Sequence, residues 1–143
     1  MEDEAPLSDQ LISPLLHLLQ VLHETAAGDL EVHIILLAIA ARVVAHPDAQ
    51  SLSNEERLAQ DARPFPTRGV NVRSIADSTG MARETVRRKV AALLRAGWIA
   101  QSAEGLTITG KGYMALNPAR EEIEQLAHRF HDTVAQRGSP GAP

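Results

Sequence analysis

The cationic side chains of this chain gather on one short segment, Thr79–Trp98, with the sequence TGMARETVRRKVAALLRAGW. Guanidinium groups on a helix can donate paired hydrogen bonds to guanine, or bind phosphates. Residues 61–100 hold eight Lys or Arg and three Asp or Glu, a net charge of +5, whereas the rest of the chain carries −9. A basic patch on an acidic body can attract a polyanion locally. The segment is therefore a candidate nucleic-acid contact, and an ordinary solvated helix face is the alternative.

A helix over this segment separates its charges from an apolar face. At 100° per residue, Val86, Val90 and Leu93 share one side, and the cations lie mainly on the other. In a helix-turn-helix, the N-terminal part of the second helix meets the bases. An exposed i,i+4 pair between Glu84 and Arg88 is the competing interpretation of the outer face. We predict base contacts from Arg83, Glu84, Thr85, Arg87 and Arg88, and phosphate contacts from Arg73, Lys89 and Arg95.

The elements on either side of this helix would hold it in place. The stretch RSIADSTG predicts a short helix that ends at Gly80, and VNV before it is strand-like. After the basic helix, WIAQ and LTIT alternate apolar and polar residues, and SAEG between them suits a hairpin turn at Gly105. A helix, a tight turn, a second helix and a hairpin follow one another in a winged helix-turn-helix.

The stretch SIADSTGMARETVRRKVAALLRAGWI resembles the helix-turn-helix of bacterial winged-helix regulators. In that pattern an apolar-Ala pair precedes the Gly turn, a T-V-x-R step begins recognition, and a Leu-x-x-x-Gly-Trp-Ile ending leads into the wing. The stretch GLTITGKGYMAL resembles the return strand and next helix of the MarR and IclR-like groups. The resemblance covers Val70–Leu116. For a MarR-like regulator it implies flanking helices that form a dimer.

The tip of the expected wing departs from the MarR-like pattern. Residues Ser102–Gly105 include Glu104 and no Arg, whereas MarR-like proteins often insert a wing-tip Arg into the minor groove. We therefore expect Gln101 and Ser102 to contact phosphate at most.

Two apolar helices are expected before the basic segment. Ser13 and Pro14 predict the start of the first helix and Gly28 its C-cap, with a start near Ser8 left open. The second helix, residues 30–46, is apolar nearly all round. Such a helix must be covered on every side, so we expect a second subunit to cover it.

The expected fold is mainly α with a small β-hairpin wing, a winged helix-turn-helix between dimerisation helices. A capping-box pattern at Ser53 and Glu56 predicts a short helix in an otherwise polar stretch. The predicted organisation is N-terminal dimerisation helices at 1–47, a linker with a short helix at 48–69, the DNA-binding domain at 70–116, a C-terminal dimerisation helix at 117–138 and a disordered tail at 139–143.

Several other classes of site find no support in the sequence. The chain has no cysteine, and His128 and His131 lack a metal-binding motif, so we interpret them as surface histidines and expect no metal or cofactor. No nucleophile and base can be paired, so we expect no enzyme. The acidic start predicts no signal peptide, and the longest apolar run, Ile34–Ala41, is too short to span a bilayer. We expect a cytoplasmic protein without membrane contact.

Together these features predict a homodimeric transcriptional regulator that binds double-stranded DNA sequence-specifically. Two recognition helices would enter successive major grooves, so the operator would be roughly palindromic with half-sites about one helical turn apart. A small-molecule effector sensed between the helical and winged parts is an addition left open. The alternative is a winged-helix protein-interaction module without DNA binding.

Overall fold

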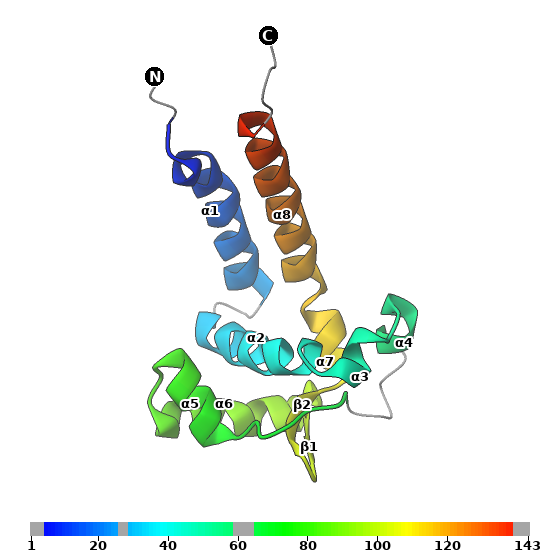
Figure 1. Ribbon diagram of the computed structural model, residues 1–143. Coiled ribbons are helices and arrows are strands. Elements are labelled where there is room, and N and C mark those ends of the chain that lie inside the picture. The colour runs from blue at the N-terminus through cyan, green and yellow to red at the C-terminus, as the bar shows by residue number, and fades with distance from the viewer. Residues whose placement is uncertain (1–4, 26–28, 59–64, 139–143) are drawn as a thin grey trace. The chain divides into compact units, whose positions relative to one another are not determined.

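The structure, a computed structural model, describes residues 5–25, 29–58 and 65–138 (Figure 1). These residues are mostly helical and include one two-stranded antiparallel hairpin, which confirms the predicted mainly α composition. None of the described helices is long and apolar enough to cross a membrane.

The chain divides into two compact units. Asp29–Leu116 forms the unit that contains the hairpin, which we call the hairpin unit. Met1–Gly28 and Asn117–Pro143 form the other, which we call the paired-helix unit.

The paired-helix unit consists of α1 (Leu7–Thr25) and α8 (Asn117–Arg137), which lie side by side (Figure 1). The helix begins at Leu7, which agrees with the start near Ser8 that was left open, and the start at Pro14 is wrong because Pro14 lies inside α1. Proline removes one backbone hydrogen bond from a helix, but α8 holds α1 on both sides of it. Before Pro14, Gln10 accepts a bond from Thr133 at 3.4 Å, and after it His17 lies 2.8 Å from Glu122. The expected cap at Gly28 and the expected tail at 139–143 lie outside the described residues.

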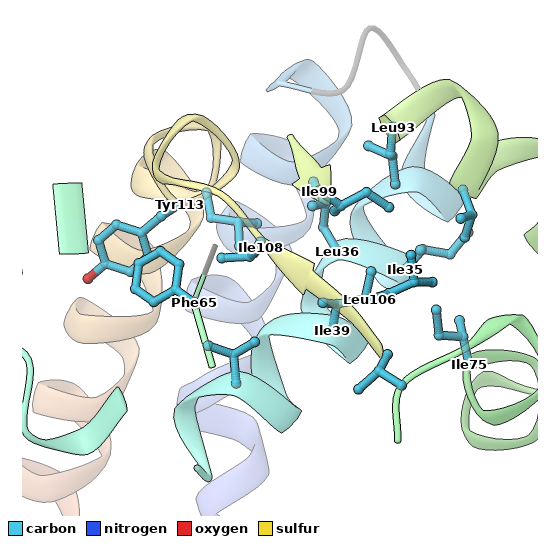
Figure 2. Packing of buried hydrophobic residues seen from close by; sticks show 14 of the residues in the cluster. Ile35, Leu36, Ile39, Phe65, Ile75, Leu93, Ile99, Leu106, Ile108 and Tyr113 are labelled. Atoms are coloured by element: carbon cyan, nitrogen blue, oxygen red, sulfur yellow. The ribbon is translucent and has the colours of Figure 1, made fainter. Parts of the chain in front are cut away.

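Helix α2 (Leu30–Val44) forms the centre of the hairpin unit. Ile35, Leu36 and Ile39 have no exposed surface and belong to one apolar cluster (Figure 2). The helix contacts α5 (Val72–Thr79), α6 (Arg83–Ala96) and β2 (Gly105–Ile108).

Helix α2 therefore belongs to the hairpin unit and not to the N-terminal dimerisation region expected at residues 1–47. The division comes at Gly28 and Asp29, because most of the apolar surface of α2 is buried within the hairpin unit itself, while Leu30, Ile34 and Val44 remain 37–47 % exposed. The second subunit expected from its composition is not needed to cover Ile35, Leu36 and Ile39.

The described parts of the expected linker, residues 48–58 and 65–69, belong to the hairpin unit. This linker contains α3 (Pro47–Gln50) and α4 (Asn54–Leu58). The predicted capping box is confirmed, since Ser53 and Glu56 exchange bonds of 2.8 and 3.1 Å. At its other end, the Phe65 ring lies 5.6 Å from that of Tyr113 in α7 (Gly110–Ala115). Residues 59–64 lie outside the described part.

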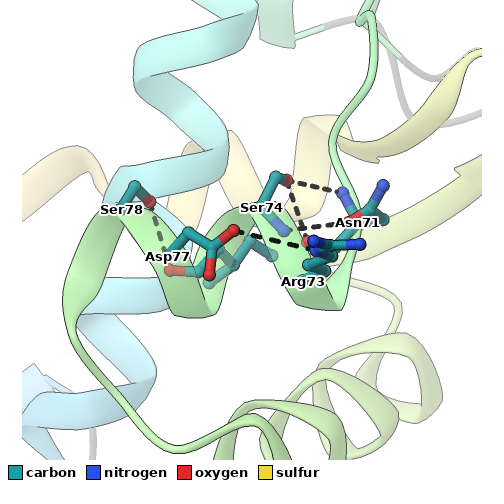
Figure 3. Close-up of polar contacts among 6 residues, drawn as sticks. Asn71, Arg73, Ser74, Asp77 and Ser78 are labelled. Carbon is teal, nitrogen blue, oxygen red and sulfur yellow. Dashed lines mark hydrogen bonds and ion pairs between the residues drawn. The ribbon is translucent and has the colours of Figure 1, made fainter.

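Helices α5 and α6 are joined by a tight turn at Gly80, as expected. Gly80 has φ of 75° and ends α5 in the left-handed region that favours glycine. Asn71 caps the start of α5, where its side chain and that of Ser74 each accept a backbone N–H at 2.9 Å (Figure 3). The strand-like character expected at residues 70–72 is confined to Val70, which forms an isolated β-bridge with Gly105, because Asn71 caps α5 and Val72 begins it.

The predicted hairpin is present. Strand β1 (Ile99–Ser102) pairs antiparallel with β2, from Ile99 opposite Ile108 to Ser102 opposite Gly105. The hairpin side chains Ile99, Leu106 and Ile108 belong to the apolar cluster around α2. The hairpin and α6 therefore share one core.

Candidate nucleic-acid interface

The buried and exposed faces of α6 are those expected from the sequence. Val86 is fully buried, and Val90 and Leu93 are 4 % exposed. On the other side the predicted arginines Arg83, Arg87, Arg88 and Arg95 are exposed, and Thr85 is half-buried.

The amino end of α6 has no side-chain cap. Ala82 occupies the N-cap position and supplies no hydrogen bond from its side chain. The N–H groups of the first turn carry a positive partial charge and remain available to an outside acceptor. Exposed Arg83 at this end adds to that positive potential.

Glu84 pairs with Arg87, not with Arg88 as the i,i+4 interpretation expected. Its carboxylate accepts from Arg87 Nε at 3.0 Å and from Nη2 at 2.5 Å. The hydrogen bonds and the charge of Arg87 lower the pKa of Glu84, and the same contact raises the pKa of Arg87. The side-on geometry explains the choice of partner, because it satisfies both carboxylate oxygens with one guanidinium. Arg88 has no hydrogen bond or ion pair with any described residue.

Three of the predicted site residues, from three elements, line one groove. Arg73 of α5, Arg87 of α6 and Gln101 of β1 border a space of about 460 Å³. Asn71 lines the same groove at the start of α5, and Ala91 and Leu94 of α6 add apolar surface. Among the described residues, Arg73 has only a long contact to Asp77, at 4.0 Å between two exposed side chains. The groove therefore joins α5, α6 and the hairpin into a single surface, which is mostly apolar and carries the cations Arg73 and Arg87 at its border.

Lys89 lies away from this surface. Its Nζ is 2.6 Å from Asp29 Oδ2 and 3.7 Å from Glu31 Oε1, and its side chain is 14 % exposed. The hydrogen bond from Lys89 lowers the pKa of Asp29, which also caps α2. Lys89 thus fastens α6 to the start of α2, where the sequence suggested a phosphate contact.

The two predicted hairpin residues have different surroundings. The Ser102 hydroxyl donates to the Gly105 carbonyl at 2.8 Å and accepts from the Glu104 N–H at 3.2 Å, so it holds the turn. Gln101 is exposed and lines the groove. Arg95 is exposed in the last turn of α6.

Asn71 is a groove residue that the sequence analysis missed. An Asn three positions before a Ser is typical of a helix N-cap and could have identified it. The valines on either side of Asn71 suggested a strand instead.

Comparison of the chain with protein-family models, curated proteins and solved structures finds no match. Within the described ranges, no group of three His, Cys, Asp or Glu side chains is arranged to hold a metal ion. The functional assignment therefore depends on the geometry of α5, α6 and the hairpin.

Proposed function

We propose that the hairpin unit is a winged helix-turn-helix domain of a MarR-like transcriptional regulator that binds double-stranded DNA. The groove shared by Arg73, Arg87 and Gln101 is the observation that carries the proposal. It places donors from the first helix, the second helix and the hairpin along one surface, as a duplex backbone and a major groove require.

In this proposal the exposed face of α6 enters the major groove, from its amino-terminal half as far as Leu94. Arg88 donates to guanine O6 and N7, and Ala91 and Leu94 contact thymine methyl groups. Arg73 and Arg95 bind phosphates and fix the orientation, and Arg83 keeps its predicted base contact. Lys89 is a positioning residue, because its ammonium group is occupied by Asp29.

The paired-helix unit supports the second part of the proposal, a homodimer. Ile12, Leu15, Leu16 and Leu19 form an apolar stripe at helical spacing on α1 and are 44–62 % exposed. Helix α8 exposes a second stripe, Ile123, Phe130 and Val134, at 41–47 %. Apolar stripes of this length normally mark an interaction surface. A second copy of the chain is the occupant that would also give the two recognition helices of a palindromic site.

Light scattering at micromolar concentration tests the dimer. The expected mass is twice the 15.5 kDa of the chain. Replacing Leu16 by glutamate places a charge in the α1 stripe and should return the mass to that of one chain, whereas Arg129→Glu on α8 should leave the dimer intact. A wild-type protein with the mass of a single chain would exclude the dimer.

Selection of bound fragments from genomic DNA tests the DNA-binding function. We expect recovery of a short palindromic motif, and an affinity that falls at least about tenfold between 50 and 200 mM salt, because counterions are released from each contacted phosphate. Absence of retained DNA at low salt would contradict the proposal and favour the protein-interaction module.

A further inference from the structure

The turn of the hairpin carries an acidic side chain where the proposed complex needs a cation. Ala103 and Glu104 form the turn, and both are exposed. A carboxylate here repels a phosphate backbone. If the hairpin approaches DNA, positive charge must come from another segment beside the turn.

The segment that precedes α5 runs along the hairpin and reaches this turn (Figure 1). The Gly69 N–H donates to the Glu104 carbonyl at 2.9 Å. The buried Thr67 hydroxyl donates to the Leu106 carbonyl at 2.9 Å. These two bonds fix the backbone on both sides of Arg68, whose own side chain is exposed.

Close backbone packing reinforces this attachment. A Cβ added at Gly105 would lie 2.7 Å from the Val70 carbonyl oxygen, and Gly105 has φ of 131°. Only glycine fits there without a shift of either segment. Arg68 is therefore held at the hairpin turn by the fold and not by its own side-chain contacts.

Arg68 shares a groove of about 700 Å³ with Arg42, from the last turn of α2. Neither guanidinium has a hydrogen bond or ion pair with a residue in the described ranges. Asp48 also lines the groove, but its carboxylate lies 3.9 Å from His46 Nδ1 and pairs with neither arginine. Two cations around one open groove attract an anion, and guanidinium groups suit phosphate oxygens.

The same segment continues into the proposed DNA surface. Asn71, three residues after Arg68, lines the groove that Arg73 and Arg87 share. Three residues of chain span at most about 11 Å, so Arg68 lies close to the edge of that surface.

We propose that Arg68, with Arg42 beside it, binds a backbone phosphate of the DNA next to the hairpin turn. These arginines supply the cation that the turn itself lacks, and they extend the interface beyond the recognition helix. The assignment rests on the proposed DNA-binding function and adds a second cationic contact to it.

Arg68→Ala is the test, measured by fluorescence anisotropy on the selected DNA over a series of salt concentrations. We expect affinity to fall about three- to tenfold at 100 mM salt, and the slope of log affinity against log salt to lose roughly 0.9 for each subunit. Preference among DNA sequences should not change, because a phosphate contact carries no base information. Arg68→Lys should restore most of the slope. Arg129→Ala, which removes the same charge from α8, is the control, and the thermal unfolding of every variant shows whether it folds.

Two outcomes separate this inference from the function on which it rests. If wild type binds DNA and Arg68→Ala binds with the same affinity and salt slope, the inference is wrong and the DNA-binding function stands. If wild type binds no DNA, both fail. A third arm adds millimolar inorganic phosphate to wild type without DNA. Thermal stabilisation that requires Arg68, together with an unchanged DNA slope in Arg68→Ala, would assign the groove to a small anion and overturn the DNA contact.

Discussion

Replacing Arg88 by alanine should weaken binding to the selected DNA about tenfold to a hundredfold, because one bidentate arginine–guanine contact contributes a discrimination of that size. Arg88 is exposed on α6, and its guanidinium has no hydrogen bond or ion pair with any described residue, although the pKa of Glu84 is lowered by Arg87 and, to a smaller extent, by the charge of Arg88. The loss should be largest at one base pair of each half-site, and binding to unrelated DNA should change little. Fluorescence anisotropy with the selected site and with single-base variants measures both quantities.

Arg87→Ala should show a different pattern, because Arg87 already binds Glu84 through two hydrogen bonds. Its removal leaves the Glu84 carboxylate facing DNA without a hydrogen-bond partner, compensated only by the charge of Arg88. Adding Glu84→Gln to Arg87→Ala should therefore recover part of the lost affinity. Arg129→Ala on α8 removes the same charge outside the proposed surface and should bind like wild type. Wild-type binding by Arg88→Ala and Arg87→Ala alike would rule out α6 as the recognition helix.

Replacing Gly112 by alanine should destabilise the hairpin unit. A Cβ at this position would lie 2.0 Å from the Trp98 carbonyl oxygen, which itself accepts the Thr109 N–H at 3.1 Å. The new Cβ would belong to α7 and the oxygen to the backbone of Trp98. Relieving the clash would require a shift of the helix or of that backbone. Overpacking of this kind costs about 1–3 kcal/mol or somewhat more, and the better helix propensity of alanine returns up to about 1 kcal/mol. We expect a net loss of about 2 kcal/mol in the free energy of unfolding, measured by urea denaturation.

Met114→Ala is the matched control, since Met114 lies in the same helix and is 59 % exposed. It should change the free energy of unfolding by less than about 0.5 kcal/mol. Unchanged stability in Gly112→Ala would mean that α7 does not press against the Trp98 backbone.

Local patterns in the sequence predicted most of the hairpin unit. The division of α6 into a face with Val86 and a face with Arg88 follows from helical periodicity. The turn at Gly80 and the hairpin with Gly105 follow from residue preferences that act over a few positions. These preferences are properties of the chain itself, so they need no knowledge of distant neighbours.

The missed features depend on contacts between residues far apart in the chain. The sequence predicts a phosphate contact for Lys89, because its actual partner, Asp29, lies 60 residues away and no local pattern indicates their pairing. Pro14 was placed at a helix start because the support from α8 comes from the other end of the chain. The sequence gives no sign of a role for Arg68, since it is the hydrogen bond from the Gly69 N–H to the Glu104 carbonyl that brings this segment to the hairpin turn. Whether Glu84 would choose Arg87 or Arg88 depends on side-chain conformation, which helical spacing leaves undecided.

The most direct test of the central claim is NMR of the isotope-labelled full chain during titration with the selected duplex. The account predicts that the largest amide shifts occur at Arg83–Thr85 in the uncapped first turn of α6, at Asn71 and at Gln101. The surface of α8 around Arg129 should change little. Shifts confined to α1 and α8, or no shifts at low salt, would contradict the assignment of α6 and its groove as the DNA-binding surface.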